Sequence, residues 1–261
     1  MKSIQSRDNS FYKQLARLSA SARQRRKSTQ TLLDGAHLLA AYLDSGKQPQ
    51  HILVNAAAMR DAEIGGLLQR LDSVPVTLLD DGLFAGLSEL KTPNGILALI
   101  EWTRPDATVS QSRFALLLED IQDPGNLGSM LRSAAAAGCD AVFLSQGCAD
   151  AWSPKVLRAA MGGHFVLDIH EDAALTDIAA GFNGATFAAT LQASDSLYVY
   201  DYTGNIAFVF GNEGAGLSEQ MINAVHHEIR IPMPGKVESL NAAVAAAVCL
   251  FEAARQRLVD N

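Results

Sequence analysis

Cysteine and long apolar runs are scarce in this chain of 261 residues. The three cysteines, Cys139, Cys148 and Cys249, are odd in number and form no C-x-x-C pair, which argues against a disulfide framework and against a zinc site. No run approaches the roughly 18 apolar residues of a membrane span, and the N-terminus is basic rather than signal-like. We therefore expect a cytoplasmic protein that needs no metal and no membrane.

Positive charge is also scarce, and it is gathered at one end of the chain. The formal net charge is −7, yet residues 1–27 carry eight Lys or Arg and one acid, a net charge of +7, which leaves −14 for the rest. An acidic body with a basic arm suits an anionic partner held at one end. A solvated charged tail accounts for the same pattern equally well.

The order of the predicted elements divides the chain into two α/β domains. In residues 1–102 the basic arm is followed by apolar residues at helical spacing over 32–43, and then by short strands. Residues 103–113 are polar and rich in turn formers, which is typical of a linker. Residues 114–261 alternate helices with apolar strands that lack polar alternation. Such strands predict a parallel sheet that helices cover on both faces.

Two strand-ending loops near the C-terminus form the candidate ligand site. One apolar strand, 206–210, leads into GNEGAGLS, which contains three glycines and the carboxylate of Glu213. The next strand, 228–232, leads into PMPG and then into an Ala-rich helix that opens near Ser239 and Asn241. Loops of this kind, at strand ends and feeding helices, are where an α/β sheet holds a small ligand.

The glycine loop matches neither of the common phosphate-binding patterns. A dinucleotide fingerprint requires G-x-G-x-x-G, whereas the order here is G-x-x-G-x-G. A P-loop requires lysine where Leu217 stands, so a bound nucleoside triphosphate would lack its cation. A nucleotide-dependent dehydrogenase is therefore not supported, and a tight structural turn explains the loop as well as a ligand site does.

Three segments occur in an order and at a spacing that resemble a known family. They are EDIQDPGNLGSMLRSAAAAG, FVFGNEGAGLS and IPMPGKVESLNAAVAAAVCLFEAAR. Together they resemble the three motifs of the SpoU (TrmH) family of S-adenosylmethionine-dependent RNA ribose 2′-O-methyltransferases, in the SPOUT superfamily. SARQRRKSTQTLLDGAHLL and KTPNGILAL are similar to the family's small L30e-like substrate-binding domain.

The resemblance implies a C-terminal parallel-sheet domain with a trefoil knot, in which the last helix threads a loop. It also implies close crossing of two loops, at which Gly211, Gly214, Gly216 and Gly235 would permit backbone approach. S-adenosyl-L-methionine would then bind in the knot. By motif position its contacts are Leu191, Gly211, Ile231, Met233 and Leu240, although core packing explains Ile231 and Leu240 equally well.

The same resemblance assigns the reacting groups. Arg132 matches the arginine held to activate the ribose hydroxyl. Because arginine stays protonated in proteins, we favour a clamp on phosphate and developing alkoxide, with proton acceptance as the alternative. Glu213 is expected to orient Arg132 or Asn126, and Asn126 could equally be a turn residue. Ser239 and Asn241 are interpreted as both helix cap and site.

The resemblance therefore predicts an enzyme that methylates a ribose 2′-hydroxyl of structured RNA and works as a homodimer. Ribosomal RNA is the first candidate substrate and transfer RNA the second. A non-catalytic RNA-binding protein that keeps the knot is the alternative of another class. The basic arm would supply the RNA contacts, and its central cluster is Arg23, Arg25, Arg26 and Lys27.

Overall fold

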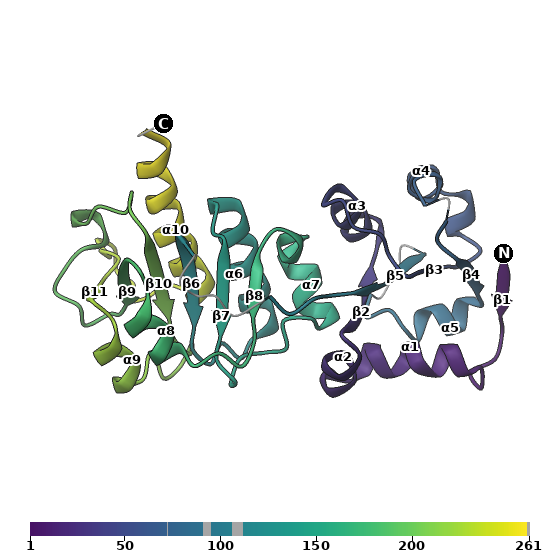
Figure 1. Cartoon of the computed structure of the whole chain (residues 1–261), viewed down its shortest axis with the longest axis horizontal. Helices are drawn as coiled ribbons and strands as arrows, with labels where there is room; N and C mark the ends of the chain where they lie inside the picture. The colour runs from purple at the N-terminus through teal and green to yellow at the C-terminus, as the bar shows by residue number, and fades with distance from the viewer. Residues whose placement is uncertain (72, 91–94, 106–111, 260–261) are drawn as a thin grey trace. The chain divides into compact units, whose positions relative to one another are not determined.

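The computed structural model describes residues 1–71, 73–90, 95–105 and 112–259, which form two units (Figure 1). The first unit comprises Met1–Thr103 and Trp152–Phe165, and the second comprises Arg104–Ala151 and Val166–Asn261. Most of the expected linker, residues 106–111, lies outside the described residues, as does the KTPN part of KTPNGILAL. Among the described residues, no helix is long and apolar enough to span a membrane.

The second unit contains the parallel sheet that the sequence predicts. Its six strands run in the order β11-β9-β10-β6-β7-β8, and every neighbouring pair is parallel. The strands are β6 (Phe114–Leu118), β7 (Ala141–Leu144), β8 (Asp168–His170), β9 (Ala185–Ala189), β10 (Ile206–Phe210) and β11 (His227–Ile229). The two central strands, β6 and β10, are buried at every position, as expected of a sheet that is covered on both faces.

Four helices of this unit pack in two pairs. Helix α8 (Leu175–Gly181) contacts α9 (Glu219–Ala224), and both face alternate strand residues such as Leu117 and Val209. Helix α6 (Pro124–Ala137) packs against α10 (Ala242–Val259), which also contacts β10. The parallel-sheet architecture is thus confirmed, while the trefoil knot stays a prediction.

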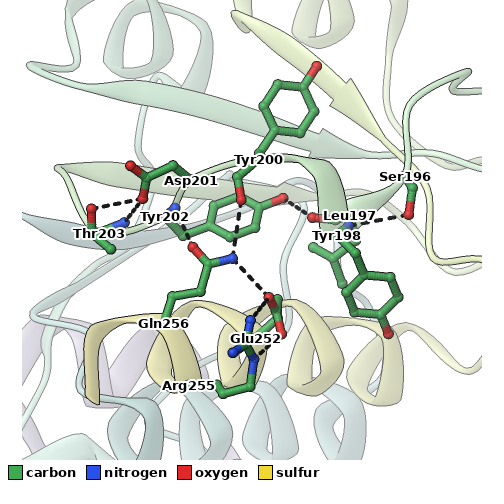
Figure 2. Close-up of polar contacts among 10 residues, drawn as sticks. All are labelled: Ser196, Leu197, Tyr198, Tyr200, Asp201, Tyr202, Thr203, Glu252, Arg255 and Gln256. Atoms are coloured by element: carbon green, nitrogen blue, oxygen red, sulfur yellow. Dashed lines mark hydrogen bonds and ion pairs between the residues drawn. The ribbon is translucent and has the colours of Figure 1, made fainter. Parts of the chain in front are cut away.

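One side chain ties the last helix to the segment that precedes β10 (Figure 2). Gln256 of α10 accepts a hydrogen bond from the Tyr202 backbone N–H at 2.8 Å and donates to the Tyr200 carbonyl at 3.1 Å. The buried Tyr202 ring packs on Phe208, and its hydroxyl donates to the Leu197 carbonyl at 2.7 Å. These contacts hold the C-terminal half of α10 in place.

The first unit has a mixed sheet in the order β1-β4-β3-β5-β2. Its strands are β1 (Lys2–Ile4), β2 (Gln30–Asp34), β3 (His51–Val54), β4 (Val76–Leu79) and β5 (Ile96–Glu101). The helices of its segment Met1–Thr103 are α1 (Ser10–Ala20), α2 (Ala22–Ser28), α3 (Ala36–Asp44), α4 (Ala62–Gln69) and α5 (Asp81–Ala85), with a short 3-10 helix, η1 (Ala58–Arg60). The basic arm is therefore folded, because α1 buries Tyr12, Leu15 and Leu18 in the core of this unit.

The helix expected over residues 32–43 is wrong at its start. Leu32 and Leu33 lie in β2, where Leu33 pairs with Ala98 of β5. Gly35 has a φ of 107°, a conformation that no helix continues through, so α3 begins only at Ala36. Apolar residues at helical spacing can thus arise where a buried strand runs directly into a helix.

The segment Trp152–Phe165 belongs to the first unit, although the sequence placed it in the 114–261 domain. It contains α7 (Pro154–Ala160) and a 3-10 helix, η3 (Gly163–Phe165). The Trp152 ring stacks on Trp102 at 4.7 Å, and the Thr31 hydroxyl donates to the Trp152 carbonyl at 2.8 Å. The stacked rings and the buried hydrogen bond therefore hold this segment in the first unit, whereas the sequence assigned it to the second domain.

We expect Gln256→Ala to lower the free energy of unfolding by about 1–3 kcal/mol, because it leaves the Tyr202 N–H without its partner. Chemical denaturation followed by circular dichroism measures this change. Gln220→Ala on α9 is the control, because it makes the same substitution at an exposed helix position that forms no hydrogen bond among the described residues, and it should cost far less. Equal losses in the two variants would show that Gln256 does not tie the helix.

Candidate active site

The strands of the parallel sheet end at a cavity of about 360 Å³. The carboxyl ends of parallel strands lie at one edge of a sheet, where α/β folds bind their ligands. Segments that follow β9, β10 and β11 line the cavity together with the start of α10. The lining residues are Ala189–Gln192, Phe210–Leu217, Ile222, Ile229, Ile231, Met233, Ser239, Leu240, Ala242 and Ala245.

All five residues assigned to the cofactor by the resemblance line this cavity. Leu191 is 61% exposed and stands at the rim, while Ile231, Met233 and Leu240 are half-buried. An apolar side chain that is half-exposed beside a cavity is available to a ligand in a way that a core side chain is not. The structure thus favours a ligand contact over core packing for Ile231 and Leu240.

Only two glycines of the two loops are required by their geometry. A Cβ on Gly211 would collide with the backbone carbonyl of Gly216, and Gly216 itself has a φ of 73°. In contrast, a Cβ on Gly214 would meet only an ordinary contact, and one on Gly235 would meet open space. The close approach predicted for four glycines is therefore observed only at Gly211, where it lies within the glycine loop itself. The prediction is wrong for Gly214, Gly216 and Gly235, because a Cβ there would meet an ordinary contact or open space.

Both ends of the glycine loop are held by the two residues that follow β6. The Asp120 carbonyl accepts from Asn212 Nδ2 at 2.9 Å, and Asn212 Oδ1 accepts from the backbone N–H of Gly214 at 2.9 Å. At the other end, the Glu119 carboxylate accepts from the Ser218 N–H at 2.8 Å and from its hydroxyl at 2.7 Å.

The roles of Glu119, Asp120 and Asn212 were not predicted. A signal was present, because adjacent acids directly after a buried strand lie at the ligand-binding edge of a sheet. Their partners are about 90 or more positions away along the chain, with Asn212 and Asp120 92 residues apart. No local pattern could have paired them.

A hydrogen-bonded row joins all three motif segments. Asn126 Nδ2 donates to Glu213 Oε1 at 2.9 Å, and Asn126 Oδ1 accepts from Asn241 Nδ2 at 2.9 Å. Asn241 Oδ1 in turn accepts from the backbone N–H of Ala243 at 2.9 Å, which caps α10. Because Glu213 only accepts and the helix N–H only donates, the orientation of both amides is determined.

Glu213 remains ionised in this setting. Partial burial raises the pKa of its carboxyl, but hydrogen bonds from the Asn126 amide and from backbone N–H groups outweigh this, so the pKa lies below its ordinary value. The stabilisation is present above the ordinary glutamate pKa and is lost as the pH falls through the lowered one. Of the two partners expected for Glu213, Arg132 and Asn126, the structure shows Asn126.

Ser239 and Arg132 lie outside this row. Ser239 lines the cavity, but Asn241 supplies the cap of α10, so the capping role expected of Ser239 is not observed. Arg132 is exposed on α6 and does not line the cavity. In the part of the chain that the structure describes, Arg132 forms no hydrogen bond or ion pair, which leaves its guanidinium available to a phosphate.

The cavity has an unusual charge for a nucleotide-type site. Glu213 is its one charged lining residue, and no Lys or Arg lines it among the described residues. A polyphosphate would find no cation there, whereas a cationic ligand is compatible with a single carboxylate. Over the described residues, no group of His, Cys, Asp and Glu has an arrangement that could hold a metal ion.

The basic cluster of the first unit is only partly exposed. Arg23 and Lys27 are exposed on α2, and Arg26 is half-buried. Arg25 is 5% exposed, and its Nη1 donates to the carbonyls of Leu18 and Ser19, the latter at 2.9 Å. The prediction that Arg25 contacts RNA is therefore wrong, because its guanidinium is buried and donates to carbonyls at the C-terminal end of α1.

Comparisons with known proteins match both units. Residues 113–251 match the SpoU rRNA Methylase family, and residues 9–98 match the MRM3-like substrate binding domain. The chain is 35% identical to an uncharacterized tRNA/rRNA methyltransferase of Synechocystis sp., over 98% of this chain and 94% of that protein. It is 32% identical to the 23S rRNA (guanosine(2553)-2'-O)-methyltransferase RlmP of Bacillus subtilis, over 96% of this chain and 98% of that protein.

A solved structure extends the likeness to the fold. The SpoU methyltransferase AviRb of Streptomyces viridochromogenes, in complex with AdoMet, is similar with a TM-score of 0.82 and 25% identity, over 96% of this chain and 100% of that chain. The family match includes Asn126, Arg132, Glu213 and Asn241. The chain belongs to the SpoU rRNA methylase family.

Proposed function

We propose that this protein transfers the methyl group of S-adenosyl-L-methionine to a ribose 2′-hydroxyl of ribosomal RNA. The observation that carries the proposal is the row from Glu213 through Asn126 to Asn241, which joins the three motif segments beside the strand-end cavity. The relatives add support, since RlmP is named a 23S rRNA 2'-O-methyltransferase and the AviRb structure is a complex with AdoMet.

The cavity suits S-adenosyl-L-methionine in shape and charge. Its glycine loop offers backbone groups, Ile231 and Met233 offer apolar surface, and Glu213 is the single charge. When bound, the cofactor supplies an electrophilic methyl group on a sulfonium. A positively charged sulfonium is compatible with this carboxylate and with the lack of lining cations.

The chain's own residues then serve to place and activate the ribose. The hydroxyl is a poor nucleophile. As its oxygen bonds to the methyl carbon, the carbon–sulfur bond of the cofactor would break and the hydroxyl proton would pass to solvent. Arg132, exposed and unpaired among the described residues, is proposed to clamp the adjacent phosphate and stabilise developing negative charge on the oxygen. Asn126 is hydrogen-bonded to Glu213 and to Asn241, and these bonds hold the start of α6 beside the loops that line the cavity.

Ribosomal RNA is proposed over transfer RNA because the first unit matches the MRM3-like substrate binding domain. The non-catalytic alternative is disfavoured by the joined motif segments, since a binding protein has no use for a cofactor cavity whose loop is tied through Asn126 to α6, the helix that also carries the exposed Arg132. We further propose a cytoplasmic location, and RNA as the anionic partner of the basic helices α1 and α2.

A homodimer is proposed with α10 as the contact. Val244, Phe251 and Leu258 recur every seven residues on this helix, and their side chains are 49%, 51% and 77% exposed. Apolar residues at this interval form one stripe along a helix, and a stripe of this kind suits the matching stripe of a second copy.

Methyl transfer is tested with labelled S-adenosyl-L-methionine and RNA from a strain that lacks the protein. We expect label in ribosomal RNA, at a linkage that resists alkali because its 2′-oxygen is blocked. Arg132→Ala should lower kcat by about 100-fold, as expected for loss of a charge-stabilising group, and should leave cofactor affinity unchanged in calorimetry. Label in no RNA would exclude the enzyme, and full turnover by Arg132→Ala would exclude the role of this arginine.

Gly211→Ala tests the cavity directly. The new Cβ collides with the Gly216 carbonyl, so we expect binding of S-adenosyl-L-methionine to weaken by about tenfold or more, as a displaced backbone costs roughly 1–3 kcal/mol. Gly214→Ala is the matched control in the same loop, because its Cβ meets only an ordinary contact. Calorimetry that finds the two variants alike would place the cofactor elsewhere.

Phe251→Glu tests the dimer. A carboxylate in the middle of the α10 stripe would be desolvated by a second copy, so we expect the mass from light scattering to fall from dimer to monomer. Met59→Glu, at a 49% exposed position of the first unit, introduces the same charge and should leave the dimer intact. A monomeric wild type, or a dimeric Phe251→Glu, would contradict the proposal.

A further inference from the structure

A second cavity lies in the first unit, between its two basic helices. It measures about 240 Å³. Helix α1 supplies Gln14, Arg17 and Leu18, helix α2 supplies Gln24, Lys27 and Ser28, and β2 supplies its first residue, Gln30. Each helix contributes three positions at i, i+3 and i+4, so each presents a single face to the cavity.

The cavity carries two cations without counter-charges. Arg17 and Lys27 are both exposed, and neither forms an ion pair with any residue that the structure describes. Among the described residues, none that lines this cavity is acidic. In contrast, the neighbouring Lys13 on α1 is paired with Asp8 at 2.8 Å. Two unpaired cations on opposite helices suit an anion between them, and phosphate groups of a nucleic acid have this character.

Beside the cations, a row of side-chain amides ends at the cavity. Gln50 Nε2 donates to Glu101 Oε2 at 2.8 Å, and Gln30 Nε2 donates to Gln50 Oε1 at 2.5 Å. Gln14 Nε2 then donates to Gln30 Oε1 at 3.3 Å. A carboxylate only accepts, so Glu101 sets the direction of the whole row.

Because the row runs in this direction, the hydrogen-bonding groups that remain on the Gln14 amide are determined. The Gln14 carbonyl oxygen accepts no hydrogen bond within the described residues, and its Nε2 keeps a second proton. One acceptor beside one donor is the pattern with which an amide pairs to the edge of a base.

We propose that this cavity binds one unpaired nucleotide of the RNA substrate, with flanking phosphates on Arg17 and Lys27 and the base edge on Gln14. At about 240 Å³ the cavity is smaller than the roughly 300–1,000 Å³ of pockets that enclose a whole small molecule. A smaller cavity with exposed cations at its edge suits one unit of a longer chain. Unpaired bases are also the parts of RNA whose edges proteins can reach.

The proposal rests on the proposed RNA substrate, and binding without cofactor tests it separately from methyl transfer. Fluorescence anisotropy of the full chain with a short labelled single-stranded RNA gives the affinity between about 50 and 200 mM salt. For Arg17→Ala/Lys27→Ala we expect the slope of log affinity against log salt to fall by about 1.4, since each phosphate contact on a single strand contributes about 0.7. Gln14→Ala should weaken binding about tenfold without changing the slope.

Lys13→Ala is the matched control, because it removes one charge from the same helix outside the cavity. An unchanged slope for it, with the reduced slope of the double variant, supports the site. Equal slope changes for Lys13→Ala and for each single cation variant would show diffuse attraction and overturn it, as would unchanged binding by the double variant. If these binding results hold while methyl transfer fails, the proposed reaction is wrong and the nucleotide site stands.

Discussion

The arrangement of the site in the second unit depends on two groups. The Glu213 carboxylate can only accept hydrogen bonds, and the backbone N–H groups at the start of α10 can only donate them. Between these two ends, Asn126 and Asn241 have a single way to orient their amides, so each hydrogen bond supports the next. The row links loops that follow β6 and β10 to the last helix. Side-chain hydrogen bonds therefore hold the three segments together.

The cavity depends on this row, because most of its lining residues lie in the loops that follow the strands. Glu119 and Asp120 hold the two ends of the glycine loop from one side, and Glu213 within the loop holds the α6 start from the other. Gly211 lets the loop close upon itself where a Cβ would strike the Gly216 carbonyl. A loop fixed at both ends and in the middle offers preformed backbone groups, which lowers the ordering cost of binding.

Positively charged side chains are placed differently in the two units. In the second unit no Lys or Arg lines the cavity among the residues that the structure describes, and Arg132 lies outside it. In the first unit, by contrast, Arg17 and Lys27 face a cavity without acids, while Arg25 is turned inward to support α1. Net charge along the sequence could not separate these uses, because neighbouring residues of one helix point in opposite directions.

Much of the fold was predictable from the sequence. Uninterrupted apolar runs such as 114–118 and 206–210, separated by helices, are typical of a parallel sheet that is covered on both faces, so they indicated this sheet. The three motif segments indicated the family and placed the cavity-lining residues. The pattern over 32–43 misled, because helical spacing does not exclude a strand that runs into a helix at Gly35.

The sequence by itself thus determined the type of each layer and the family, since these follow from periodicity and from motifs within short windows. Only the tertiary structure decided that Glu213 holds Asn126 rather than Arg132, that Arg25 is buried, and that Trp152 packs on Trp102 in the first unit. The physical reason is common to all three. Each depends on which side chain meets which across the folded chain, and a sequence pattern describes only neighbours along it.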